Sequence, residues 1–173
     1  MTASKAVAQH WRLMTAADLP AVEAIAAQVH SGYPEEAAIF AERLRLYPAG
    51  CRILTTADSS AILAYLISHP WYLLQPPSLD TLLEALPIAP TTYYIHDIAL
   101  LPQTRGTGAA QAVVQMLAEH ALASGLANMS LVAVNDSTGF WARNGFKVHT
   151  DPALAAKLSS YDSAARLMIR TLG

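Results

Sequence analysis

Apolar residues near the start of the chain follow the period of a helix. Thr15 and Asp18 mark a helix start, because a threonine cap followed by an acid satisfies free backbone N–H groups. Apolar residues then recur at positions 19, 22, 25, 26 and 29, the spacing of one helix face. A second helix is predicted to open at Pro34 and to end before Pro48. A short strand over residues 10–14 is predicted to precede both helices, after a flexible tail over residues 1–9.

Strand and helix signals alternate through the rest of the chain. Two β-rich runs at 51–56 and 61–68 flank a polar turn, which predicts a hairpin. Residues 69–91 hold five of the ten prolines, so an irregular segment with one short helix near 79–86 is predicted. The later strands are predicted at 92–100, 129–134, 146–149 and 166–171, and the later helices at 107–124, 137–143 and 153–159. This alternation predicts an α/β or α+β domain around one mixed sheet.

The composition describes one soluble domain with little surface charge. The chain has 173 residues, of which 53% are hydrophobic and 14% charged, whereas an average chain is about 25% charged. Because a domain commonly has about 100–200 residues, one domain is predicted over residues 10–173. With so few charged residues, part of the surface is expected to be apolar and to be covered by a ligand or by a second copy of the chain. A homodimer is therefore a possible assembly. The single cysteine, Cys51, favours a reducing compartment.

Charge and hydropathy also limit the partners. Eleven Lys and Arg residues stand against thirteen Asp and Glu residues, without a basic run, so no nucleic-acid partner is expected. No apolar run reaches the roughly 18 residues of a membrane-spanning helix, and the first residues lack a secretory segment. We therefore expect a cytoplasmic protein without membrane contact.

The residues most indicative of chemistry follow the strand predicted at 92–100. Arg105, Gly106 and Gly108 form a loop that leads directly into a helix. The glycines let backbone N–H groups approach a ligand, and the first helical turn has N–H groups without an acceptor in the helix. Together with the arginine, these groups predict an anion site of the kind that binds phosphates.

This loop has three other interpretations. A turn that needs glycine only for its backbone shape explains the same residues. A dinucleotide-binding fingerprint fits poorly, because Gln111 replaces its third glycine and no acid follows about 20 residues later. A P-loop is excluded, because no Gly-Lys-Ser/Thr follows.

The residues from Arg105 to Ala110, Arg-Gly-Thr-Gly-Ala-Ala, match the R/Q-x-x-G-x-G/A signature of the GNAT superfamily of N-acetyltransferases. Pro102 stands three residues before Arg105, as in that family. Residues 134–146 (VNDSTGFWARNGF) resemble its second motif, and the order of elements over 10–171 is similar as well. The resemblance implies the GNAT fold: a central mixed, mostly antiparallel sheet of six to seven strands with helices on both faces.

The resemblance also implies acetyl-CoA as cofactor and assigns residues to it. Backbone groups of the strand before the signature would bond the pantetheine arm, and the glycine loop would cradle the pyrophosphate. The residues that match these roles are Ile98, Ala99, Leu100, Arg105, Gly106, Thr107, Gly108, Ala109, Ala110, Asn135, Phe140 and Trp141. A core role for the aromatic pair Phe140 and Trp141 is compatible with a place beside the cofactor.

The same strand offers the catalytic residues. Strict alternation places Tyr94, His96 and Ile98 on one face and Ile95, Asp97 and Ala99 on the other. Family members carry a base at positions matching Tyr94 or His96. His96 is the first choice, because imidazole exchanges protons near neutral pH. Asp97 would orient or brace the site, and a core role for His96 remains an alternative.

The proton donor for the leaving thiolate departs from the family pattern. Trp141 stands where the family usually has a tyrosine on the short helix, and an indole N–H is no proton acid. Tyr161 is the candidate to replace that tyrosine as proton donor. A purely structural role for Tyr161 is the alternative.

The acceptor site is predicted from the first two helices and the segment 69–91. Tyr33, Glu35, Trp71 and Tyr72 are its predicted lining. Glu35 would attract a cationic amine, with helix capping as the alternative. The histidines other than His96, His30 among them, have no metal-ligand spacing, so no metal is expected.

The sequence thus predicts an acetyl-CoA-dependent N-acetyltransferase. It would transfer acetyl directly, in a ternary complex, to a primary amine of a small molecule, or to a peptide N-terminus or lysine. A non-catalytic acyl-CoA-binding or sensing module is the alternative, because the usual tyrosine is missing. A nucleotide-binding domain that uses the glycine loop for another diphosphate is a third hypothesis.

Overall fold

A seven-stranded mixed sheet forms the centre of the fold. The computed structural model describes residues 7–173. Its strands are β1 (Gln9–Leu13), β2 (Cys51–Thr56), β3 (Ser59–Trp71), β4 (Thr92–Leu100), β5 (Asn128–Ala133), β6 (Lys147–Val148) and β7 (Arg166–Thr171). They are arranged in the order β1-β2-β3-β4-β5-β7-β6. Every neighbouring pair is antiparallel except β4 and β5, which are parallel.

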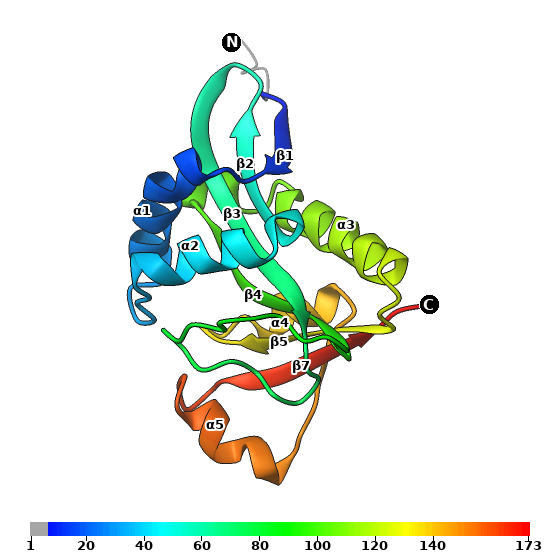
Figure 1. The fold of residues 1–173 in the computed structure, drawn as a ribbon. Coiled ribbons are helices and arrows are strands. Elements are labelled where there is room, and N and C mark those ends of the chain that lie inside the picture. The colour runs from blue at the N-terminus through cyan, green and yellow to red at the C-terminus, as the bar shows by residue number, and fades with distance from the viewer. Residues whose placement is uncertain (1–6) are drawn as a thin grey trace.

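Helices cover both faces of this sheet. They are α1 (Leu19–Val29), α2 (Ala37–Leu46), α3 (Ala109–Ala123), α4 (Thr138–Arg143) and α5 (Ala155–Ser159), with 3-10 turns at Ala16–Asp18, Pro48–Gly50, Pro102–Thr104 and Pro152–Leu154. α1 and α2 pack one hydrophobic cluster against β2 and β3, and α3 and α4 pack another against β4, β5 and β7. Figure 1 shows these helix pairs on opposite sides of the sheet. The predicted fold class is confirmed.

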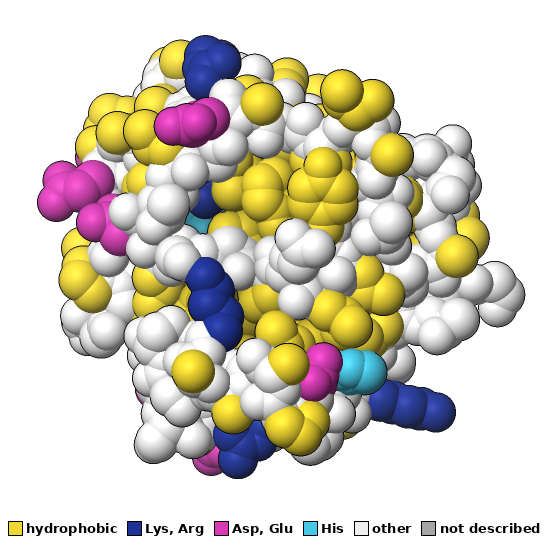
Figure 2. Space-filling view, turned by 60° about the horizontal axis from the view of Figure 1, so that its bottom comes forward, with side chains coloured by type: hydrophobic (Ala, Val, Ile, Leu, Met, Phe, Trp, Pro, Cys, Tyr) yellow, Lys and Arg dark blue, Asp and Glu magenta, His cyan; other side chains and the backbone are white. Residues whose placement is uncertain are grey.

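Charged side chains are sparse on the surface, as the composition predicts. Figure 2 shows one face of the molecule, where hydrophobic side chains gather in a central hollow. None of the helices within residues 7–173 is long and apolar enough to cross a membrane. The same residues contain no group of three or more side chains placed to hold a metal ion.

Several predicted element bounds shift by a few residues. Gln9 belongs to β1, so the predicted tail ends before it, and residues 1–6 of that tail lie outside the described residues. The second helix begins at Ala37 rather than at Pro34. β3 continues through Pro70 to Trp71, beyond Ile67, its last residue paired with β2. Proline is tolerated there because β3 has only one neighbouring strand over its last residues.

The helix predicted near 79–86 is wrong. Asp80 and Glu84 have φ angles of +50° and +66°, which a right-handed helix does not allow. The backbone N–H groups of Leu83 and Glu84 instead bond the buried carboxylate of Glu42 on α2, at 2.7 and 2.9 Å. Arg43 donates to the carbonyl of Thr81 at 3.0 Å. Tertiary bonds to α2 therefore fix this segment without secondary structure.

Strict alternation along β4 is also wrong. Ile67 and Ser68 of β3 are consecutive, yet they lie opposite Asp97 and Ile95, so His96 is an extra residue in the ladder. Such a bulge turns the next side chains to the other face. His96 and Asp97 therefore both face the side of α1 and α2. Ile98 packs with the cluster beneath α3, and Ala99 packs with that beneath α1.

We predict that Arg43→Met lowers the free energy of unfolding by about 3–5 kcal/mol, because it leaves the buried Glu42 carboxylate without its cation. Urea unfolding at neutral pH measures the change. Arg45→Met is the matched control on an exposed position of the same helix, where a change within about 0.5 kcal/mol is expected. Equal effects of the two substitutions would contradict a structural role of the buried pair.

Candidate functional site

The site begins where β4 and β5 separate. The two parallel strands are paired only at Tyr93–Met129 and Tyr94–Ser130. β5 remains paired with β7 as far as Ala133, and β4 remains paired with β3 as far as Leu100. From Ile95 onward, the edge of β4 that faces β5 therefore has no partner strand. Backbone N–H and C=O groups without a strand partner are available to bond a ligand.

A cavity of about 700 Å³ fills this opening. Its walls come from the end of α1, from β4, from the loop and first turn of α3, from the end of β5, and from α4. The lining residues are Val29, His30, Ile95, His96, Asp97, Ile98, Leu100, Thr104, Arg105, Gly106, Gly108, Ala109, Ala110, Gln111, Leu131, Val132, Val134, Asn135, Ser137, Phe140, Trp141, Arg143 and Asn144. A cavity of this size accommodates a large, elongated ligand.

One end of the cavity is formed by the backbone of the glycine loop and the first turn of α3. Gly106 and Gly108 have φ angles of +74° and +83°, and a Cβ added to either would meet no atom within 4 Å. The glycines therefore provide a left-handed backbone and leave open space, rather than close packing. The first bond of α3 runs from Ala112 N–H to Gly108 O at 3.0 Å. The N–H groups before it have no acceptor within the helix and can bind an anion.

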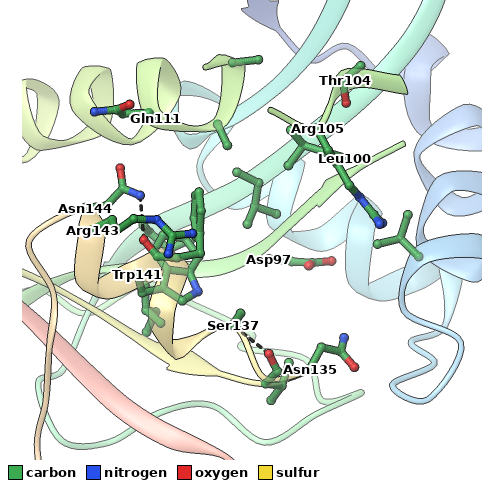
Figure 3. A pocket seen from close by; sticks show the side chains of 18 of the residues that line it. Asp97, Leu100, Thr104, Arg105, Gln111, Asn135, Ser137, Trp141, Arg143 and Asn144 are labelled. Carbon is green, nitrogen blue, oxygen red and sulfur yellow. Dashed lines mark hydrogen bonds between the residues drawn. The ribbon is translucent and has the colours of Figure 1, made fainter. Parts of the chain in front are cut away.

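Arginine side chains approach the cavity from two walls. Figure 3 shows Thr104 and Arg105 at the loop, Asp97 and Leu100 on β4, Trp141 and Arg143 on α4, and Asn144 directly after α4. Both arginines line the cavity and can donate charged hydrogen bonds to phosphate oxygens. Arg143 was not among the predicted site residues, although it follows Trp141 closely in the second motif.

Aromatic side chains build the α4 wall. Trp141 is 5% exposed, and its ring packs edge-on against Phe140 and Phe146, with centroids 4.9 and 5.3 Å apart. Phe140 is partly buried against the same core. The position of Phe140 and Trp141 between core and cavity is therefore compatible with both predicted roles, packing in the core and lining the cofactor site.

Two histidine–carboxylate pairs lie in the middle of the site. His96 Nε2 is 2.9 Å from Glu35 Oε1, and both side chains are 6% exposed. His30, which ends α1, places its Nε2 2.7 Å from Asp97 Oδ1 and 3.2 Å from the carbonyl of Ile98. Because these partners are all acceptors, each Nε2 atom carries a proton and each Nδ1 atom is free to exchange one. The bulge at His96 is what brings both pairs to one side of β4.

Several groups fix the charge of the His30–Asp97 pair. Burial raises the pKa of Asp97, but the hydrogen bond and charge of His30 outweigh it, so this pKa lies below its usual range. Burial lowers the pKa of His30, but Asp97, the Ile98 carbonyl and the charge of Glu35 outweigh it, so this pKa is raised. Tyr65 donates a hydrogen bond to Asp97. These contacts therefore favour the ionised form of the pair.

A second, smaller cavity of about 50 Å³ adjoins the first. His30, His96, Asp97, Val132 and Val134 line both. The other walls of the small cavity are Tyr33, Glu35, Pro77, Leu79, Tyr94 and Tyr161. Burial raises the pKa of Tyr161 to about 12, and its hydroxyl donates to the Pro77 carbonyl. The two cavities therefore meet at the histidine–carboxylate pairs.

The structure brings most predicted site residues together and leaves four out. Trp71 and Tyr72 line neither cavity. Trp71 instead packs edge-on against the buried His69 ring and donates to the Gln75 carbonyl. The Ala99 side chain points into the α1 cluster, and the Thr107 hydroxyl bonds the Thr104 carbonyl. Glu35 lies before α2 and pairs with His96, so it does not cap that helix.

His30 is the main residue that sequence reasoning missed. It stands 67 positions before Asp97 in the sequence, without a motif around it. Its position at the end of α1 was the one available signal. Asn135, whose φ is +54°, was predicted, and its amide nitrogen lies 3.4 Å from His30 Nδ1.

Comparisons with known proteins agree with this architecture. The model of the acetyltransferase (GNAT) family matches residues 18–146. Ard1 from Thermoplasma volcanium is 18% identical, with a TM-score of 0.71 over 96% of this chain and 99% of that one. Naa20 from Chaetomium thermophilum, solved with a bisubstrate analogue, is 15% identical, with a TM-score of 0.71 over 94% and 86%.

A third similar structure contains a bound cofactor. N-acetylglutamate synthase from Neisseria gonorrhoeae, complexed with coenzyme A and N-acetyl-glutamate, is 13% identical, with a TM-score of 0.68. The match covers 98% of this chain and 36% of that one. At these identities the likeness shows a shared fold. No curated protein matches the chain by sequence.

We predict that the stability contributed by the His30–Asp97 pair declines as the pH rises above 6.5. The folded pKa of His30 is raised from its ordinary value of 6.5. Its contribution is therefore fully present below that value and is lost as the pH rises through the folded pKa. Asp97, with its lowered pKa, contributes above about 3.8 and loses its contribution in stronger acid.

Urea unfolding of the wild type and of His30→Gln between pH 5.5 and 9 measures this effect. The difference in free energy of unfolding between the two proteins should shrink as the pH rises. The buried His69, whose pKa burial lowers to about 3, is common to both proteins and cancels. A difference that stays constant or grows with pH would contradict the raised pKa.

Proposed function

Because the chain belongs to the acetyltransferase (GNAT) family, we propose that it is an acetyl-CoA-dependent N-acetyltransferase acting on a primary amine of a small molecule. The observation that carries the proposal is the continuity of the site. One cavity leads from the glycine loop, along the unpaired edge of β4, to two histidine–carboxylate pairs, where a second cavity begins. Direct transfer in a ternary complex needs a donor site and an acceptor site that meet at the reacting groups.

The donor cavity has the chemistry that coenzyme A requires. The N-terminus of α3 and the side chains of Arg105 and Arg143 would hold the phosphates. The free edge of β4 at Ile98 and Leu100 would bond the amide-bearing arm. Phe140 and Trp141 would form the apolar wall. When bound, acetyl-CoA would supply the activated acetyl group and a thiol leaving group.

His96 is the proposed general base. Its Nε2–H is held by Glu35 at 2.9 Å, which leaves Nδ1 to take a proton from the acceptor ammonium. The carboxylate stabilises the imidazolium that forms and keeps the ring in one orientation. Tyr94, 4% exposed, lines the acceptor side beside them and would shape the site rather than exchange protons, since burial raises its pKa well above the usual range.

His30 is the proposed proton donor to the departing thiolate. The α4 side chains that line the cavity are Phe140, Trp141 and Arg143. The two rings have no acidic proton, and a guanidinium does not give up its proton near neutral pH. The His30–Asp97 pair, whose surroundings raise the pKa of His30 and so favour the imidazolium, lies on another wall of the same cavity. An imidazolium there can give its Nδ1 proton to sulfur and recover a proton from the acylated nitrogen. Tyr161 is the weaker choice, because its hydroxyl bonds Pro77 and it lines only the smaller cavity.

The function is tested by measuring acetyl-CoA binding by calorimetry and acetyl transfer by release of free thiol with a panel of primary amines. Binding with transfer supports the proposal. Binding without transfer to any amine would favour a non-catalytic acyl-CoA-binding module. Binding of NAD or ADP in preference to acetyl-CoA would favour a site for another diphosphate. A cytoplasmic location and a homodimer remain predictions from the composition.

We predict that Arg105→Ala raises the Kd of acetyl-CoA about tenfold, because a charge-assisted hydrogen bond to phosphate contributes about 1.5 kcal/mol or more. Calorimetric titration measures the change. Arg166→Ala is the matched control, since this exposed arginine bonds the carbonyl of Ala165 and lines neither cavity. An unchanged Kd in Arg105→Ala would contradict the assignment of the phosphate-binding site to the glycine loop.

We predict that His96→Gln lowers kcat by about 10²–10⁴, the usual contribution of a general base. The wild-type kcat should fall as the pH rises through the raised pKa of His30, above 6.5, because the proton donor is then lost. His30→Gln should lower kcat and abolish this alkaline fall. His149→Gln, outside both cavities, serves as control. An alkaline fall that persists in His30→Gln would exclude His30 as the donor.

A further inference from the structure

The walls that the small cavity does not share with the donor cavity come from four separate parts of the chain. Tyr33 and Glu35 lie between α1 and α2, and Tyr94 lies on β4. Pro77 and Leu79 belong to the irregular segment, and Tyr161 precedes β7. Only the side of the histidine–carboxylate pairs is shared with the donor cavity. A molecule in the small cavity therefore meets the reacting groups at one end only.

Hydrogen bonds connect the segments that form the walls of the small cavity, and these connections are called its roof below. The Tyr161 hydroxyl donates to the Pro77 carbonyl, and Lys157 donates to the Ser78 hydroxyl. The Tyr33 hydroxyl donates to Asp162. The segment itself is anchored farther along, because Glu36 N–H donates to Asp80 and Asp80 N–H donates to Glu35. These bonds resist the opening that an extended polypeptide would need.

The size of the cavity limits what it can hold. Its volume is about 50 Å³, and one water molecule needs about 10–15 Å³ by the same measure. The cavity therefore holds about three to five non-hydrogen atoms. Pro77, Leu79, Val132 and the ring of Tyr94 make several of its walls apolar.

The charges around the cavity favour a cation. Among the described residues that line it are two carboxylates, Glu35 and Asp97, and no lysine or arginine. The hydrogen bonds of Glu35 to His96 and to the Asp80 N–H leave its carboxylate charge in place, so an ammonium group finds negative charge near the reacting end. A substrate carboxylate would find no cationic partner other than the histidines, which are already paired.

We propose that this cavity is the acceptor subsite. It takes a primary amine whose carbon chain is short and carries no charge, such as an alkylamine or amino alcohol of about three to five non-hydrogen atoms. Amino acids are excluded because their carboxylate would find no free cation. Polypeptide N-termini are excluded because the hydrogen bonds of the roof leave no room for an extended chain. The proposal rests on the proposed acetyltransferase function and narrows its acceptor. Leu79 is then a specificity-determining residue, because it lines this cavity and not the donor cavity.

The test compares kcat/KM for four acceptors with saturating acetyl-CoA: n-butylamine, glycine, benzylamine and a tetra-alanine amide. n-Butylamine and glycine have the same number of non-hydrogen atoms but differ in the carboxylate. The wild type should prefer n-butylamine over glycine by about 100-fold, because a carboxylate would be buried without a free cation. Benzylamine and the peptide should be slower than n-butylamine.

Leu79→Ala should raise kcat/KM for benzylamine relative to n-butylamine by about tenfold, since the lost side chain enlarges the cavity. Leu82→Ala is the matched control, because this leucine is 49% exposed on the same segment and lines neither cavity. Tyr161→Phe removes the roof bond without changing the ring, and should shift the same ratio in the same direction. Circular dichroism confirms that each variant folds.

The outcomes separate this proposal from the proposed function. Preference for glycine or the peptide, or an unchanged ratio in both Leu79→Ala and Tyr161→Phe, overturns the acceptor subsite while acetyl transfer stands. Acetyl-CoA binding without transfer to any of the four acceptors also overturns the subsite and favours a non-catalytic module. Absence of acetyl-CoA binding overturns the proposed function itself.

Discussion

The interruption of pairing between β4 and β5 is the constraint on which the site depends. Two parallel strands that part after Tyr94 and Ser130 leave unpaired backbone in the middle of a sheet, where such groups need a partner. Each strand keeps its other neighbour, so the sheet stays intact while the opening forms. The glycine loop at the start of α3 and the aromatic wall of α4 both lie beside this opening. A cavity for a long ligand is thus produced by sheet topology.

Charge inside the opening is controlled by pairing. Glu35 and Asp97 are largely removed from water, and each holds the Nε2–H of a histidine. Without these partners, the cost of burying the carboxylates would raise their pKa values, as desolvation does here on its own. The same bonds orient two imidazole rings with their Nδ1 atoms free. Stability and proton transfer therefore rest on the same contacts, and the pairs mark the junction of the two cavities.

The proline-rich segment provides an ordered wall without secondary structure. Glu42 and Arg43 of α2 bond its backbone, and Tyr161 and Lys157 bond its other end. Because these anchors lie on elements that pack on the sheet, the small cavity is shaped by the fold as a whole. Substitutions in this segment can alter acceptor size without touching the cofactor-binding loop, which lies in the other cavity.

The element order, the mixed sheet and the glycine loop follow from the sequence alone, because hydrophobic period, glycine spacing and motif residues are local signals. Arg105, Asn135, His96 and Asp97 were predicted as site residues from motifs or from one strand, and all four line the larger cavity. The partners of the histidines depend on the tertiary structure. His30 reaches Asp97 across 67 positions, and a bulge at His96 overrides strict alternation. The helix predicted near 79–86 does not form, because its backbone bonds the Glu42 carboxylate instead. In each of these cases long-range contacts outweigh local propensity.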